Sequence, residues 1–148
     1  MFVSGVIADS FIRYGIPPIK SHRGIIVTGM TCSAICTLLV PYISGATGAA
    51  CGIGLALFFT YLAGNSGWCL VPVIAPSGVV GSVGAIQNSG SFICASFAPV
   101  ITGLLLDRTH SFHLPLIICS IVSMLGALSY LLIVKHPILV SGPRPLRS

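Results

Sequence analysis

Four polar or amphipathic side chains lie within otherwise apolar sequence, and they are the residues best suited to hold a ligand. They are Asn65, Trp68, Gln87 and Asn88. A carboxamide both donates and accepts hydrogen bonds, as a substrate hydroxyl requires, and an indole packs against an apolar edge. Buried amides need partners, so these side chains are expected to face either a neighbouring helix or an aqueous cavity. Gln87 and Asn88 are adjacent and point in different directions, so at least one is expected to line a cavity.

Acid–base and metal chemistry have few residues available in this chain. From Gly24 to Leu106 there is no Asp, Glu, Lys, Arg or His. The one close pair of histidines, His110 and His113, lies in a single loop, and two histidines alone do not complete a metal site. The six cysteines lie in apolar segments, where cysteine packs as a small hydrophobic side chain. We therefore expect no metal, no cofactor and no enzymatic activity.

The uncharged run also indicates the solvent in which the chain folds. Only 6% of the residues are charged and 55% are hydrophobic, whereas about a quarter of the residues of a soluble domain are charged. Because a charge inside hydrocarbon costs at least a few kcal/mol, such a run is typical of a bilayer. The net charge of +5 comes from basic residues outside the run, as around membrane helices. Nucleic-acid binding needs clustered basic residues with aromatic ones between them, and is not expected.

The expected fold is an all-α membrane protein with four transmembrane helices, preceded by the end of a fifth. A span takes about 20 apolar residues. At membrane depth four such runs cannot close a β-barrel, so they must be helices. The expected segments are the end of a truncated helix at 1–8, a cytoplasmic loop at 9–23, transmembrane helices at 24–43, 49–75 and 79–106, an outer loop at 107–113, a transmembrane helix at 114–134 and a cytoplasmic tail at 135–148.

The charges outside the spans predict the orientation. The loop 9–23 holds three basic residues against one Asp, and the tail 135–148 holds basic residues and no acidic one. Four spans place this loop and this tail on the same side of the membrane, and the positive-inside rule makes that side cytoplasmic. We expect a multi-pass protein of the plasma membrane, of the bacterial inner-membrane type.

The residues before the uncharged run resemble a known sequence pattern. Gly5, Asp9, Arg13 and Gly15 are spaced as Gly-x-x-x-Asp-x-x-x-Arg-x-Gly, and Arg23 follows. The pattern resembles the cytoplasmic loop between helices eight and nine in the anion:cation symporter family of the major facilitator superfamily. This family comprises sugar-acid transporters related to galactonate, glucarate and tartrate permeases.

Later stretches are similar to the same family, in the same order. Residues 63–68 resemble its tenth helix and residues 84–90 its eleventh. The resemblance implies that the chain is the C-terminal third of a twelve-helix transporter, from the end of helix eight to helix twelve. It also implies a role in substrate binding for the polar residues described at the outset. Trp68 and Asn88 match the wall of the substrate cavity, and Asn65 and Gln87 match it less well.

The resemblance further implies a function. The chain is expected to be part of a secondary active transporter that moves a small organic anion by alternating access, coupled to a proton or another cation. In the family, the N-terminal half supplies the coupling carboxylates and a substrate-binding arginine. The expected partners are therefore membrane lipid, the organic anion with its co-transported ion, and the missing N-terminal helices, with no nucleic acid. The alternative is a small four-helix membrane protein that acts as a structural or oligomeric assembly subunit.

Overall fold

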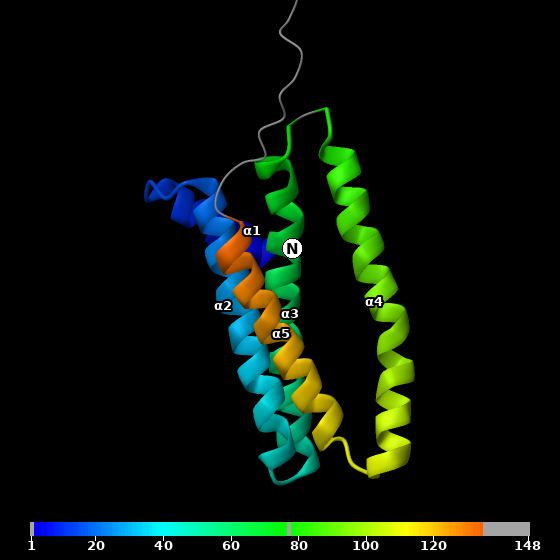
Figure 1. Ribbon diagram of the computed structural model, residues 1–148. Coiled ribbons are helices and arrows are strands. Elements are labelled where there is room, and N and C mark those ends of the chain that lie inside the picture. Colours follow the sequence, from blue (N-terminus) through cyan, green and yellow to red (C-terminus); the bar gives the residue numbers. More distant parts are fainter. Residues whose placement is uncertain (1, 77, 135–148) are drawn as a thin grey trace, which may run out of the picture.

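The computed structural model describes residues 2–76 and 78–134 and is helical throughout (Figure 1). No strand occurs in these two ranges, so the all-α prediction is confirmed. The predicted tail 135–148 lies outside the described residues. The elements are α1 (Phe2–Arg13), α2 (Pro18–Leu39), the 3-10 helix η1 (Val40–Tyr42), α3 (Ala46–Ile74), α4 (Val80–Thr109) and α5 (His113–Ile133).

Four of these helical segments are long and apolar enough to cross a membrane. They have 25, 29, 30 and 21 residues, and the first combines α2 with η1. At 1.5 Å per residue, about 20 residues cover a hydrocarbon core of about 30 Å. The four candidate spans confirm the multi-pass architecture. The helices begin and end at other residues than the predicted spans, and a helix can continue past the hydrocarbon, so the predicted membrane boundaries stay predictions.

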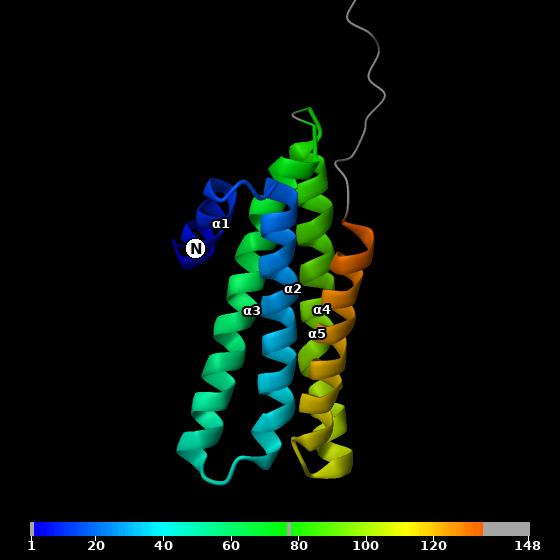
Figure 2. The same ribbon diagram turned by 90° about the vertical axis from the view of Figure 1, so that its left-hand side faces the viewer.

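The helices run alternately up and down, so the turn before α2 and the carboxyl end of α5 lie at the same end. The connections at 40–45 and 110–112 lie at the lower end in Figure 1. The turn at 14–17, the turn after α3 and the carboxyl end of α5 lie at the upper end, with α1 beside them (Figure 2). This arrangement follows from the even number of spans between the turn at 14–17 and the carboxyl end of α5. Which end is cytoplasmic stays a prediction.

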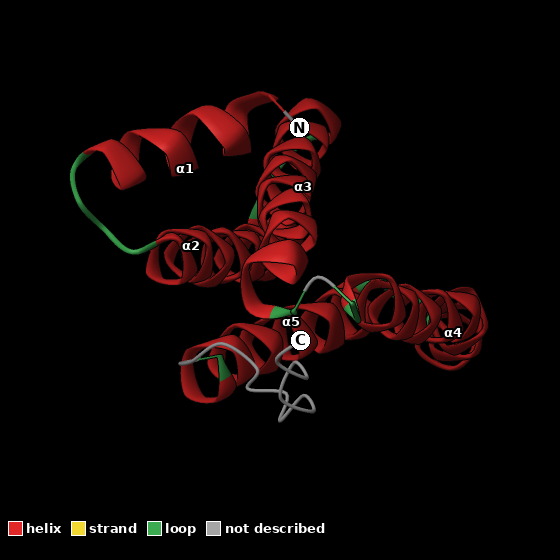
Figure 3. Cartoon of the chain, turned by 90° about the horizontal axis from the view of Figure 1, so that it is seen from above, coloured by secondary structure: helices red, strands yellow, loops and turns green. Residues whose placement is uncertain are grey.

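Helices α2, α3 and α5 form a packed group, and α4 lies to one side of it (Figure 3). The approach of α2 to α3 depends on Gly29. A Cβ added there would lie 3.0 Å from the carbonyl oxygen of Phe59 and 3.1 Å from the Cβ of Ala63. Small residues at such crossings let helix backbones pack closely in a membrane, where lipid tails are as apolar as the side chains. By contrast, no residue of α4 is buried.

Serine and threonine hydroxyls link the three packed helices. The Ser33 and Thr60 hydroxyl oxygens are 2.7 Å apart between α2 and α3. From α5, Ser120 donates to the carbonyl oxygen of Ala34 at 2.8 Å, and Ser123 donates to that of Met30 at 3.0 Å. Both acceptors are on α2, and a helical carbonyl has a second lone pair for such a bond. These bonds fix how α5 is rotated about its own axis relative to α2.

Candidate functional site

Trp68 lies in the second half of α3 and separates two cavities. Its side chain is 47% exposed, although an indole at a helix contact is usually well covered. One cavity, here called the inner cavity, has a volume of about 240 Å³ and lies among α2, α3, α4 and α5. The other, the side cavity, has a volume of about 360 Å³ and lies between α3 and α4. Trp68 therefore forms a wall common to both.

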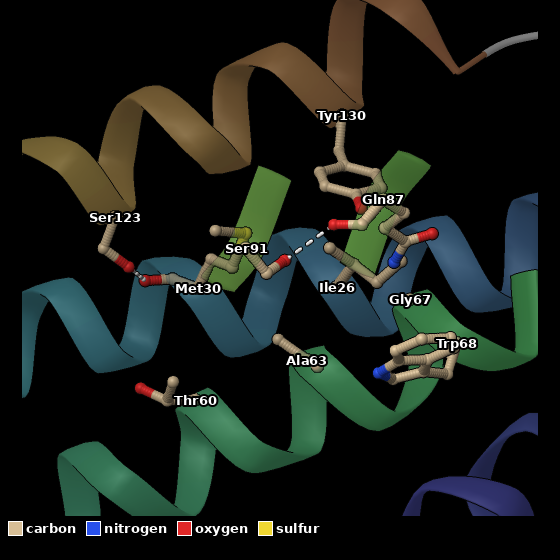
Figure 4. A pocket seen from close by; sticks show the side chains of 11 residues that line it. Ile26, Met30, Thr60, Ala63, Gly67, Trp68, Gln87, Ser91, Ser123 and Tyr130 are labelled. Atoms are coloured by element: carbon tan, nitrogen blue, oxygen red, sulfur yellow. Dashed lines mark hydrogen bonds between the residues drawn. The ribbon is translucent and has the colours of Figure 1, made fainter. Parts of the chain in front are cut away.

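The inner cavity is lined by polar side chains from three helices (Figure 4). Trp68 and Gly67 come from α3, Gln87 from α4 and Tyr130 from α5. The other polar groups in its wall are the hydroxyls of Thr60, Ser91 and Ser123. None of these groups carries a formal charge, so the cavity offers hydrogen bonds to a ligand but no ionic partner.

The side cavity is lined by the amide of Asn88 and by small residues. Gly81, Gly84 and Ala85 of α4 line it together with Asn88, opposite Val71 and Pro72 of α3. A Cβ added at Gly84 would lie 3.9 Å from the Trp68 ring. The glycine therefore leaves the face of the indole open to this cavity.

The two carboxamides of α4 line different cavities, and adjacent residues of a helix point in directions about 100° apart. Gln87 lines the inner cavity and Asn88 the side cavity. Asn65 is half-buried and lines neither. Two residues along a helix correspond to a rotation of about 200°, so Asn65 and Gly67 point to nearly opposite sides of α3. The structure thus brings Trp68 together with Gln87 and Asn88, and a binding role for Asn65 stays a prediction.

Comparison with known proteins identifies relatives of this chain. No protein-family model matches the chain. The chain is 49% identical over 138 residues to the probable L-galactonate transporter of Escherichia coli (strain K12), covering 93% of the chain and 30% of that relative. It is 28% identical over 134 residues to the D-galactonate transporter of Escherichia coli O6:H1, covering 90% and 30%. It is 27% identical over 111 residues to the hexuronate transporter of Bacillus subtilis, covering 75% and 26%.

The chain is a homologue of the sugar-acid transporters of the anion:cation symporter family. The family resemblance of the sequence is therefore confirmed. The chain spans about 30% of the length of these relatives, which are transporters and not enzymes. The described part of this transporter homologue contains no group of three or more potential metal ligands.

The loop pattern of this transporter homologue lies apart from both cavities. Gly5, Asp9 and Arg13 are on α1, where Asp9 and Arg13 are exposed. Gly15 lies in the turn before α2 with φ = 83°, a backbone conformation that residues with a Cβ rarely adopt. Arg23, on α2, is half-buried and lines neither cavity. A role of the pattern in cytoplasmic contacts stays a prediction.

Arg23 instead connects two ends of the packed group. Its Nη1 donates a hydrogen bond of 3.0 Å to the carbonyl oxygen of Val134, just beyond the last residue of α5. Nearby, the hydroxyl of Ser21 donates to the carbonyl oxygen of Ala8 on α1 at 3.2 Å. A cation at the carboxyl end of a helix is favourable because of the helix dipole. Two residues near the start of α2 therefore hold α1 and α5 at this end.

Tyr130 is one of the polar residues of the inner cavity that the sequence did not predict, together with Thr60, Ser91 and Ser123. Ser120, Ser123, Ala127 and Tyr130 are spaced 3, 4 and 3 residues apart and fall on one face of α5. All four are buried or half-buried. In a helix that is apolar nearly all round, this stripe of small and polar residues was the available signal for the inward face.

Proposed function

We propose that these helices form one wall of the substrate path in a secondary active transporter for small organic anions of the sugar-acid type. The single observation that supports it most is the position of Trp68 between two cavities, each with one carboxamide of α4 in its wall. The relatives that include galactonate and hexuronate transporters agree with this substrate class.

The proposed binding chemistry is neutral. Asn88 and Gln87 hydrogen-bond the hydroxyl groups of the substrate, and Trp68 packs against its apolar edge. The substrate carboxylate and the coupling proton or cation need acidic or basic side chains, and residues 24–106 contain no Asp, Glu, Lys, Arg or His. The family resemblance assigns those groups to helices of the N-terminal half. We propose that the wall described here works together with them.

The proposed mechanism is alternating access, in which helices tilt around a site near the middle of the membrane. Pro72 and Pro99 lie inside α3 and α4, and a proline there removes a backbone hydrogen bond and bends the helix. Pro72 also lines the side cavity. A bend beside the cavity, next to a helix with no buried residue, supports movement of α4 relative to α3. We further propose that the loop 9–23 faces the cytoplasm of a bacterial inner membrane, because it is the more basic side.

The test is uptake of L-galactonate by the assembled transporter that contains these helices, reconstituted in vesicles. Asn88→Ala is expected to weaken the apparent affinity about fivefold, because one hydrogen bond contributes about 1 kcal/mol. Trp68→Ala is expected to weaken it about tenfold through loss of the aromatic contact. Ser89→Ala and Phe92→Ala, at exposed positions of α4, are the matched controls.

Two further results decide the proposal. Dissipation of the proton or sodium gradient is expected to abolish accumulation of the anion above its external concentration. An apparent affinity that is unchanged in both Asn88→Ala and Trp68→Ala would remove the binding role of this wall.

A further inference from the structure

We propose that Gly67 leaves a gap between Gln87 and Tyr130 in which a neutral hydroxyl group binds. A Cβ added at Gly67 would lie 3.6 Å from Nε2 of Gln87 and 3.7 Å from the hydroxyl oxygen of Tyr130. Gly67, Gln87 and Tyr130 all line the inner cavity of about 240 Å³, so a ligand atom in this part of the cavity neighbours two polar groups, one from α4 and one from α5. Figure 4 shows both side chains converging on this point of α3.

The other polar groups in the wall of the inner cavity already donate hydrogen bonds to the backbone. Thr60 donates to the carbonyl oxygen of Ala56 at 2.9 Å. Ser91 donates to that of Gln87 at 2.9 Å, and Ser123 donates to that of Met30 at 3.0 Å (Figure 4). These three hydroxyls have no proton left to give to a ligand.

The carboxamide of Gln87 and the phenol of Tyr130 retain their full bonding capacity. Within residues 2–76 and 78–134 neither side chain makes a hydrogen bond. The carboxamide has two donor hydrogens and an acceptor oxygen, and the phenol both donates and accepts. At membrane depth a polar group without a partner costs several kcal/mol, so both groups favour a ligand that can bond to each of them.

The chemistry of the gap selects a hydroxyl. A hydroxyl donates and accepts at once, which matches an amide on one side and a phenol on the other. No charged side chain lines the inner cavity, so an ion has no partner there. Two sources supply this chemistry: a water molecule, which occupies about 30 Å³ in the liquid, or a hydroxyl of the transported sugar acid. The second source rests on the proposed function, and the first does not.

Two substitutions test the gap without disturbing the helices. Tyr130→Phe removes one hydroxyl and keeps the ring. Gly67→Ala puts a methyl group at ordinary contact distance from both polar atoms, so it fills the gap without a clash. The matched controls are Tyr61→Phe, at an exposed tyrosine of α3, and Gly54→Ala, a glycine of α3 with open space around it. Gly67→Ala and Gly54→Ala are expected to raise the melting temperature alike, since alanine favours a helix more than glycine does.

The readout is the fluorescence of Trp68, the single tryptophan of this chain. It is measured in the assembled transporter that contains these helices, with any tryptophan outside this chain replaced by phenylalanine, reconstituted in nanodiscs. D-galactonate, which has hydroxyls, and adipate, which has none, are titrated in turn. If the sugar acid fills the gap, both variants lower the affinity for D-galactonate about fivefold and leave that for adipate unchanged. If water fills it, both affinities are unchanged, and the difference in Trp68 emission between H₂O and D₂O shrinks in both variants.

Two results overturn the proposal. In one, Tyr130→Phe and Gly67→Ala behave as their controls in both the titrations and the solvent comparison. In the other, the affinity for adipate falls as much as that for D-galactonate, which indicates general damage to the cavity. A failure of the proposed function looks different: no anion changes Trp68 emission at all, while the solvent comparison still reports on the gap.

Discussion

The contact between α2 and α3 at Gly29 predicts that adding one methyl group there opposes folding, although alanine is the better helix former. The new Cβ would lie 3.0 Å from the carbonyl oxygen of Phe59 and 3.1 Å from the Cβ of Ala63. Normal carbon contacts are 3.5–4.0 Å. The neighbours are a backbone atom and the first atom of a side chain, so neither can rotate away. The helices must therefore move apart.

The magnitude follows from two opposing terms. Replacing a helical glycine by alanine gains about 0.8–1 kcal/mol. Overpacking a closely packed contact costs about 1–3 kcal/mol. Gly24 lies on the same helix with nothing within 4 Å of an added Cβ, so Gly24→Ala carries only the first term. The free energy of unfolding of Gly29→Ala is expected to be about 1–3 kcal/mol below that of Gly24→Ala.

The assay is unfolding of the reconstituted chain by increasing mole fraction of sodium dodecyl sulfate, followed by circular dichroism. The comparison of Gly29→Ala with Gly24→Ala cancels the helix propensity and leaves the packing term. Equal stabilisation by the two substitutions would refute a close α2–α3 crossing at Gly29. A second variant combines Gly29→Ala with Ala63→Gly, which removes one of the two short contacts. The double variant is expected to lose less stability than the sum of the two single variants.

Two further substitutions test the hydrogen bonds that hold α5. Arg23→Met is expected to lower the free energy of unfolding by about 1.5–3 kcal/mol, because a half-buried charged donor to the end of α5 is lost, whereas Lys20→Met on the exposed side of α2 should change it little. Equal effects of the two in the same unfolding assay would contradict the contact. Ser120→Ala is expected to lower the free energy of unfolding by about 0.6 kcal/mol, which is typical of hydrogen bonds between membrane helices. Ser129 is exposed on α5, and Ser129→Ala is expected to cause no measurable change. A larger loss in Ser129→Ala would mean that α5 is rotated differently.

The number and type of helices could be predicted from the sequence because membrane physics leaves few choices. A long uncharged run must span, and a span must satisfy its own backbone. That Gln87 and Asn88 point in different directions was also predictable, because adjacent helical residues are rotated by about 100°. Such arguments need only local geometry and the chain's polarity.

The rotation of each helix about its own axis could not be predicted in the same way. A helix that is apolar nearly all round has no single hydrophobic face to orient it. Tyr130 reaches the inner cavity because Ser120 and Ser123 bond to carbonyls of α2 and so fix the rotation of α5. Asn65, although polar, lies on the side of α3 away from Gly67. Tertiary hydrogen bonds, and not the residue's own polarity, decide which polar groups reach the cavities.

The neutral character of the wall around Trp68 has a consequence for selectivity. A wall of amides, hydroxyls and an indole cannot balance the charge of a carboxylate, so under the proposed function the anionic group is bound by other helices. What this wall can do is bond the uncharged end of the substrate. A site built around hydroxyl bonds rejects an analogue that lacks them far better than an apolar pocket rejects an extra methylene, because its own polar groups are then left without partners. These helices are therefore expected to discriminate among organic anions by their hydroxyl groups, and Gln87, Asn88 and Tyr130 are the positions at which that preference can be changed.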